Sequence, residues 1–316
     1  MNTANQKRVI ALGFFDGVHV GHQALLNLAA RRSEELGAIP SAFTFDVHPS
    51  SLILHAPVPL LSTPADRAGL MRRSCGIRDV IVCHYDQRMM HTPWREFVTD
   101  YLVGIHQAAH LVAGHDFHFG YKGEGNPQRL QQLCAELGIG CDIVPKVERE
   151  GITVSSTAIR NLIAQGEMAQ AVRLLGHPHV LTGTVNHGKK LGSTLGFPTV
   201  NLHLPAGALS PAFGVYATKV WVLPGYSDHQ ACLPGSGPYP AVTNVGIRPT
   251  VDDSDAVTVE GFLLDFDGDL YGRQVRMEFY TYLRPERKFD TLDELKEEVM
   301  RNAQQTRDFF ASHPTS

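Results

Sequence analysis

The alternation of short apolar runs with longer amphipathic runs over the first 180 residues constrains the fold more than any other feature. The run VIALGFF (9–15) precedes HQALLNLAARRSEELG (22–37), where Leu25, Leu28, Ala29 and Leu36 have the spacing of one helix face. Further apolar runs start at residues 39, 78, 109 and 141, and helical runs cover 64–76, 93–105 and 127–138. Repeated strand-helix-strand units predict a parallel sheet covered by helices.

Beyond residue 180 the chain changes to runs of β-forming residues separated by Gly and Pro. These runs cover residues 179–185, 197–204, 214–223, 239–246, 256–266 and 274–283, and they predict antiparallel β-structure. A helix is expected over 290–310, with Asp290 or Thr291 as its cap. The 316 residues exceed one typical domain of ~100–200 residues. We therefore expect two domains, residues 1–179 and 180–316.

Composition and charge favour an ordinary globular protein that acts on small molecules. Charged residues make up 19% and apolar residues 43%, and the net charge is −4, which argues against a broad nucleic-acid footprint. No apolar run approaches the ~18–20 residues of a membrane span. The five cysteines include no CxxC pair and are odd in number, so buried free thiols are expected. We expect a cytoplasmic protein without membrane or nucleic-acid partners, and the sequence allows weak or transient self-association.

The segment GFFDGVHVGH (13–22) is the first candidate site. It joins the first strand to a helix expected near His22, the place where a helix N-terminus offers N–H groups to phosphate. The spacing of His19 and His22 brings two donors together, and Gly21 leaves room for a nucleotide. The alternative is that both histidines only cap the helix. Metal ligation is less attractive, because no third ligand is obvious nearby.

The segment SSTAIR (155–160) is a second candidate for phosphate binding. Ser155, Ser156 and Thr157 can donate from a helix start, and Arg160 follows one turn later. Taken alone, such a run is more often a simple helix cap. Together with the two histidines it predicts a triphosphate site.

A third candidate site, GKKLGSTLGFPTVN (188–201), lies in the β-rich half. Its glycines allow a close approach to phosphate, but the run lacks the GK[ST] ending of a Walker A loop. Thr199 and Asn201 lie two residues apart on an expected strand and so face the same way. Their oxygens suit Mg²⁺, while the alternative is a plain polar strand face.

Nine segments carry a resemblance to a known family. GFFDGVHVGH, FTFDVHP (43–49), GHDFHFGYKGEGN (114–126) and SSTAIR resemble the adenylyltransferase module of bacterial bifunctional FAD synthetases. GKKLGSTLGFPTVN, GVYA (214–217), NVGIRPT (244–250), VTVEGFLLDFDGDLYG (257–272) and LRPERKF (283–289) resemble their riboflavin kinase module. The resemblance implies a Rossmann-like α/β nucleotidyltransferase domain of the HxGH type, followed by an antiparallel β-barrel riboflavin kinase domain with a C-terminal helix.

The implied chemistry is phosphorylation of riboflavin to FMN and adenylylation of FMN to FAD, both with Mg-ATP. In the first half, His19 and His22 would be catalytic and His48, Asp116 and Phe117 would lie near the substrates. The residues that would hold ATP there are Gly13, Phe14, Asp16, Gly21, Ser155, Ser156, Thr157 and Arg160. His48 has an equal alternative as a turn residue before Pro49. The aromatic residues of 116–121 have an alternative as core, but two flanking glycines and Lys122 favour a loop that faces the substrate.

In the second half the resemblance implies that Glu260 is the base for the ribityl hydroxyl. Thr199 and Asn201 would bind Mg²⁺, and Asn244 and Arg248 would contact the flavin. The residues that would bind ATP phosphates are Gly188, Lys189, Lys190 and Gly196. Ser193 stands where the family commonly carries a basic residue, which puts one phosphate contact in doubt.

Two other functions compete with this interpretation. An HxGH enzyme could adenylylate a different acceptor, such as phosphopantetheine or nicotinate mononucleotide, and the FPTVN and YG motifs argue against that. The second alternative is a flavin-binding or flavin-storage protein that has lost its active sites. Five intact candidate residues argue against it: His19, His22, Thr199, Asn201 and Glu260.

Overall fold

The structure is a computed structural model that describes residues 6–187, 199–224, 237–247 and 257–313. Internal contacts divide the chain into two compact units, Met1–Ala158 and Ile159–Ser316. This division falls inside one helix, whereas the change in sequence pattern lies some twenty residues later. The domain boundary at 179/180 stays a prediction.

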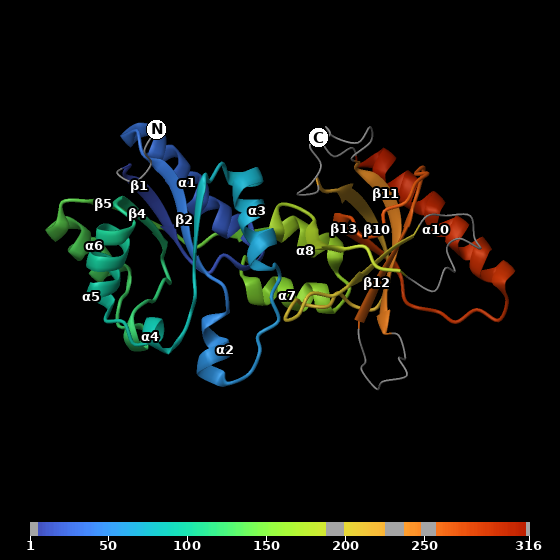
Figure 1. The fold of residues 1–316 in the computed structure, drawn as a ribbon, viewed down its shortest axis with the longest axis horizontal. Coiled ribbons are helices and arrows are strands. Elements are labelled where there is room, and N and C mark those ends of the chain that lie inside the picture. The colour runs from blue at the N-terminus through green and yellow to red at the C-terminus, as the bar shows by residue number, and fades with distance from the viewer. Residues whose placement is uncertain (1–5, 188–198, 225–236, 248–256, 314–316) are drawn as a thin grey trace. The chain divides into compact units, whose positions relative to one another are not determined.

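The first unit is built on five parallel strands. They are β1 (Arg8–Leu12), β2 (Ile39–Phe45), β3 (Asp79–Cys83), β4 (Ala108–Gly114) and β5 (Gly140–Val144), in the order β3-β2-β1-β4-β5. In the central strand β1, every residue from Val9 to Leu12 is buried, as expected when helices cover both faces. The predicted Rossmann-like parallel sheet is confirmed (Figure 1).

The main helices of this unit begin and end within two residues of the predicted positions. They are α1 (Val20–Leu36), α3 (Pro64–Cys75) and α6 (Pro127–Leu137). Pro64 and Pro127 stand in the first turn, and Gly37, Gly76 and Gly138 end the helices in the left-handed conformation. Helix α1 starts at Val20, two residues before the expected His22, because His19 is its cap.

Shorter elements complete the unit, and most of them carry no periodic signal. The helix expected over 93–105 becomes α5 (Trp94–Glu96) and a π-helical segment η3 (Phe97–Ile105). The unpredicted elements are α2 (Pro49–Leu54), α4 (Gln87–Met90), the 3-10 turns η2 (Asp16–Val18) and η4 (Tyr121–Gly123), and the hairpin of β6 (Glu148–Arg149) and β7 (Ile152–Thr153). Each is too short for a hydrophobic period to be read.

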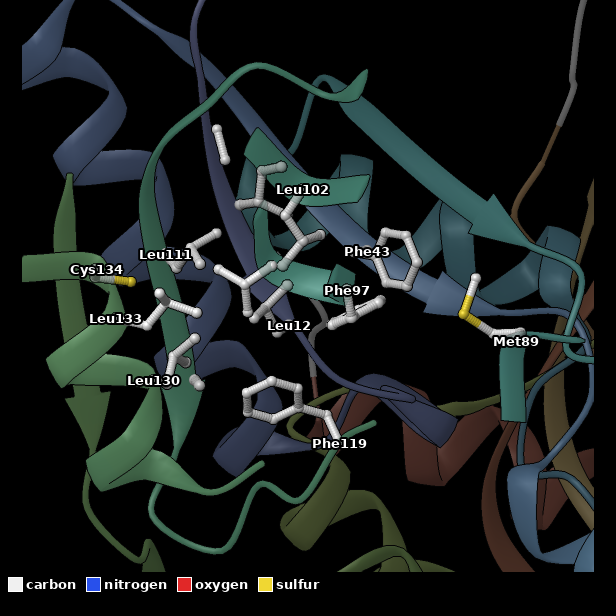
Figure 2. Packing of buried hydrophobic residues seen from close by; sticks show 14 residues of the cluster. Leu12, Phe43, Met89, Phe97, Leu102, Leu111, Phe119, Leu130, Leu133 and Cys134 are labelled. Carbon is white, nitrogen blue, oxygen red and sulfur yellow. The ribbon is translucent and has the colours of Figure 1, made fainter. Parts of the chain in front are cut away.

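One face of the parallel sheet packs against η3 and α6 to form the main core. Figure 2 shows Leu12 and Leu111 from the sheet among Leu102, Leu130 and the ring of Phe119. The described cysteines are free; Cys75 and Cys134 are buried, and Cys83 and Cys141 are partly buried.

The second unit consists of an antiparallel sheet and helices. Helix α7 (Ser156–Ala164) crosses the division, and α8 (Met168–Leu175) follows. The strands are β8 (His179–Thr184), β9 (Thr199–His203), β10 (Gly214–Val222), β11 (Tyr239–Ile247), β12 (Val257–Leu263) and β13 (Gln274–Arg284), in the order β8-β13-β10-β11-β12-β9. The sheet curls into a half-barrel whose edges meet where Asn186 N donates to Asn201 O at 2.9 Å.

A long C-terminal helix, α10 (Leu292–Ser312), packs against this sheet. Ala303 contacts Val215 and Val242 of the strands in a small apolar cluster. Thr291 is its cap, with Oγ1 accepting from Glu294 N at 3.2 Å, and Glu294 Oε2 accepts from Asp290 N. Asp290 and Thr291, the two predicted caps, therefore both take part in one capping arrangement. Over the described residues, no helix has the length and apolarity needed to traverse a membrane.

Candidate active site

Two cavities of the first unit open where the parallel strands end. The strand order reverses between β1 and β4, which is where open α/β sheets bind ligands. The larger cavity, about 390 Å³, is lined by the segments after β1, β4 and β5. The smaller, about 320 Å³, is lined by segments that follow β1 to β4. Gly13 and Phe14 line both cavities, so the two spaces share a wall.

His19 and His22 form a stacked pair in the larger cavity. Their ring centroids lie 3.5 Å apart with an interplanar angle of 17°. His19 Nδ1 also accepts a hydrogen bond from His22 N at 3.2 Å. The expected proximity is confirmed, and the capping alternative holds for His19 at the same time. A Cβ at Gly21 would lie 3.1 Å from the His19 ring, so glycine leaves room for the pair.

Burial keeps the His22 imidazole uncharged. Its Nδ1 is buried and has no hydrogen-bond partner within the described part of the chain. Burial lowers the pKa of His22 well below its usual range, and the neighbouring His19 and Arg67 lower it further. An anionic ligand would favour the protonated form again. The larger cavity is therefore suited to a negatively charged ligand such as a polyphosphate.

The loop between β1 and α1 adopts an uncommon backbone conformation. Phe15 and Val18 have φ of 57° and 44°, in the left-handed region that side chains rarely adopt. Asp16 is 1% exposed, and its carboxylate accepts hydrogen bonds from Leu61 N and Ser62 N, both at 3.1 Å. It supports the loop from behind and is not among the described residues that line the cavity. Its contact with ATP stays a prediction.

The hydroxyls of SSTAIR perform two different tasks. Ser155 Oγ accepts from the main-chain N–H three residues on at 3.2 Å, as a helix cap does. Ser156 Oγ donates to the main-chain O of Asp16 at 3.0 Å and so ties α7 to the histidine loop. Both serines line the larger cavity, whereas Thr157 is exposed and Arg160 lies one turn further along α7.

The smaller cavity was not found from the sequence. Its aromatic lining consists of Phe14, Phe43, Phe45, Tyr85, Phe97, Phe117 and Phe119. Phe117 and Phe119 stack at 5.2 Å with an interplanar angle of 18°. Flat apolar walls of this kind accept a planar heteroaromatic ring. No sequence pattern finds this pocket, because its walls come from four segments that are far apart in the sequence.

Three predicted substrate residues lie in or next to the walls of these cavities. His48 caps α2, with Nδ1 accepting from Ser50 N at 3.1 Å, and its ring meets the edge of Phe14 at 4.7 Å. The turn and substrate interpretations of His48 are therefore compatible. Asp116 lines the larger cavity with a side chain 81% exposed, while Phe117 lines both.

In the second unit three predicted site residues lie in one row across the sheet. Glu260 on β12 is paired in register with Asn201 on β9 and with Asn244 on β11. Directly opposite residues project from the same face, with Cβ atoms about 4.5–5.5 Å apart. Thr199 lies two residues before Asn201 and so shares that face. The strand register thus brings together residues that are up to 61 positions apart in the chain.

A cavity of about 200 Å³ adjoins this row. It is lined by Asn244 and Glu260 of the sheet and by Asn302 of α10, and Arg284 and Glu286 complete its polar side. Glu286 Oε1 accepts from Asn244 Nδ2 at 3.0 Å. The carboxylate of Glu260 has a buried Oε1. The remaining predicted residues, Gly188, Lys189, Lys190, Ser193, Gly196 and Arg248, lie outside the described residues.

These two sites define a class of protein. A parallel sheet with stacked histidines at its strand-order reversal is the arrangement of a nucleotide-dependent transferase. The polar row on the half-barrel is a second candidate site, with a carboxylate that can accept a proton. The chain is therefore a transferase with two sites of different design.

Comparison with known proteins gives the particular family. The FAD synthetase family model matches residues 1–158, and the riboflavin kinase model matches residues 175–310. A bifunctional riboflavin kinase/FMN adenylyltransferase of Listeria monocytogenes is 35% identical over 96% of this chain and 93% of its own length. The enzyme of the same name from Escherichia coli is 34% identical over 96% of this chain and 92% of its own length.

A solved structure shares the fold over nearly the whole chain. It is a protein from Streptococcus pneumoniae named macrolide-efflux protein, with a TM-score of 0.80 and 29% identity over 96% of this chain and 94% of that one. Only the likeness of fold is carried over from it. The chain belongs to the bifunctional riboflavin kinase/FMN adenylyltransferase family, with the FAD synthetase part first and the flavokinase part second.

Proposed function

We propose that the larger cavity of the first unit holds ATP and that the adjoining aromatic cavity holds the ring of FMN. The single observation that carries this is the wall of Gly13 and Phe14 shared by both cavities. A flavin in the aromatic cavity can extend its phosphate past this wall toward His19 and His22. The planar lining also favours a flavin over an acceptor without a flat ring.

In this arrangement an FMN phosphate oxygen attacks the α-phosphorus of ATP, and the bond to the pyrophosphate oxygen breaks. His19 and His22 donate hydrogen bonds to the phosphate oxygens as negative charge builds on them. Such transfer depends mainly on positioning and charge stabilisation. Ser155 and Ser156 stand at the N-terminus of α7, where main-chain N–H groups favour an anion. The products are FAD and pyrophosphate.

We propose further that Glu260 accepts the proton of the terminal ribityl hydroxyl in the second unit. The hydroxyl oxygen then attacks the γ-phosphorus of ATP, and ADP leaves with the β–γ bridging oxygen. Asn244, one strand away, lies close enough to orient the same substrate. Because proton loss is weakly demanding in a loose transition state, a carboxylate suffices as base.

The second site also fits a magnesium ion that accompanies ATP. Thr199 and Asn201 offer two hard oxygen donors on one strand face, and phosphate and water oxygens would complete the coordination. Bound Mg²⁺ supplies charge neutralisation on the phosphates. The net charge of −4 and the small-molecule cavities support an enzyme that acts without nucleic acid. We propose further that it is cytoplasmic and can self-associate weakly or transiently.

The decisive experiment separates the two activities in one chain. The purified protein is incubated with riboflavin or FMN and Mg-ATP, and the flavins are resolved by chromatography. His19→Ala with His22→Ala should abolish FAD but leave FMN formation, whereas Glu260→Gln should abolish FMN formation and leave FAD formation from supplied FMN. Loss of both activities in each variant would contradict two separate sites.

A further inference from the structure

A fully buried arginine, Arg67 of α3, stands behind the wall shared by the two cavities. Its side chain is 0% exposed, although arginine is rarely buried completely. Nη1 donates to Thr44 Oγ1 at 2.9 Å and to Phe45 O at 2.8 Å. Its guanidinium carbon lies 4.1 Å from the centroid of the Phe14 ring.

The contacts of Arg67 converge on Phe14 by two routes. Thr44 Oγ1 accepts a hydrogen bond from Arg67 and donates one to Phe14 O at 2.7 Å. These two bonds fix the main chain of Phe14. The guanidinium fixes the ring of Phe14 by a cation-π contact. The centroid of the same ring lies 4.7 Å from that of His48, at an interplanar angle of 70°. Phe14 thus contacts both Arg67 and a residue predicted to lie near the substrates.

A second set of contacts links Arg67 to the base of the histidine loop. Nη2 lies 3.5 Å from Ser62 O, at the limit of a hydrogen bond. Ser62 in turn donates through its main-chain N to Asp16 and accepts from Gly17 N at 3.0 Å. The loop from Phe14 to His19 is therefore anchored to the same helix start that carries Arg67.

A purely structural role would not require a charge at this position. The acceptors of Arg67 are a hydroxyl and main-chain carbonyls, none of which carries a charge. Burial lowers the pKa of Arg67 to about 10, although the charges of Asp16 and Asp46 act to raise it. Burying a cation is costly, and an apolar side chain of similar volume often serves the fold as well. The planar guanidinium, in contrast, can bind two acceptors and a ring at once.

We propose that Arg67 is a positioning residue for FMN adenylylation, which acts by holding Phe14 and the histidine loop in the geometry that the transfer requires. This inference rests on the proposed function of the first site. Arg67 touches neither substrate and acts through Thr44 and Phe14. Its loss therefore reduces the turnover rate more than substrate binding.

The test uses the full-length protein and Arg67→Lys, which keeps the charge but not the fork of donors. We expect kcat for FAD formation to fall by about 100-fold, as for a displacement near 1 Å, with KM for FMN within about threefold of wild type. Arg72→Lys, an exposed neighbour on α3, is the matched control. Riboflavin phosphorylation by the same molecules should be unchanged. A folded Arg67→Lys protein with unchanged kcat would overturn the proposal.

A second variant keeps the proposal testable if Arg67→Lys does not fold. Thr44→Val removes the hydroxyl between Arg67 and Phe14 at nearly constant volume, and we expect a comparable fall in kcat. In the double variant kcat for FAD formation should fall no further than in the more affected single variant, because both changes break the same connection. Additive reductions in kcat would overturn the proposal. FAD formation absent from the wild type itself would instead refute the proposed function.

Discussion

At the scale of single residues, Gly21 shows how one hydrogen atom in place of a methyl group shapes the first site. An added Cβ would lie 3.1 Å from the His19 ring, so the ring must move by a few tenths of an ångström. We predict that Gly21→Ala lowers the rate of FAD formation about tenfold, since a full 1 Å displacement costs about 100-fold. Riboflavin phosphorylation should not change.

The measurement is the steady-state rate of FAD formation from FMN. Asn27→Ala, at an exposed position of the same helix, provides the control. An unchanged rate for Gly21→Ala would mean that the stacked histidine geometry does not limit catalysis.

His179 on β8 gives a pH-dependent prediction. It is 2% exposed, and burial, assisted by His177, lowers its pKa to about 4. The unfolded chain binds a proton near pH 6.5, while the folded chain does so only near pH 4, so acid favours unfolding between these values. We predict that the free energy of unfolding of the second unit falls by up to about 3 kcal/mol from this residue as pH drops from 7 to 4.

Urea unfolding at pH 7 and at pH 4.5 measures this effect. His179→Leu should flatten the pH dependence relative to wild type, whereas His203→Gln, at an exposed position, should not. Equal pH dependence in wild type and His179→Leu would contradict the assigned shift.

At the scale of elements, α10 places a buried carboxylate against two arginines of the second unit's cavity. Glu298 is 5% exposed and lies 3.2 Å from Arg284, 3.7 Å from Arg287 and 3.0 Å from Arg301. Arg284 and Arg287 line the cavity beside Glu260. The helix therefore orients two cavity cations through one acidic residue.

We predict that Glu298→Leu destabilises the second unit by about 2 kcal/mol and raises KM for riboflavin. This loss of stability should be smaller than the ~3–5 kcal/mol that results from breaking a fully buried ion pair, because Arg287 and Arg301 are largely exposed. Thermal unfolding and riboflavin kinetics test this, with Glu297→Gln at an exposed position as the control. A changed stability with unchanged KM would separate α10 from the site.

At the scale of the whole molecule, the two activities of the family in one chain make FMN both product and substrate. We predict that a mixture of the His19→Ala/His22→Ala variant and the Glu260→Gln variant forms FAD from riboflavin. Neither variant should do so alone, and FAD in the mixture should appear after a lag while free FMN accumulates. Chromatography over time measures this, and a mixture that forms FMN but never FAD would show that FMN must stay within one molecule.

The sequence by itself determined the strands of both sheets, the main helices and much of the candidate chemistry. Hydrophobic period and Gly or Pro punctuation located the five parallel strands, the six antiparallel strands and α10, because these signals depend on neighbouring residues. The segment 13–22 predicted the proximity of His19 and His22 for the same reason, as they lie within one helical turn.

Only the tertiary structure decided which distant residues meet. The aromatic cavity is assembled from four segments that are far apart in the sequence. The row of Asn201, Glu260 and Asn244 depends on a strand register that no local pattern specifies. The sequence around Arg67 predicts only an ordinary helix residue. Its burial beneath Phe14 follows from contacts that join it to the end of β2 and to the loop after β1. Local periodicity fixes which face of an element is apolar, but contacts between separate elements depend on packing, which a single element does not encode.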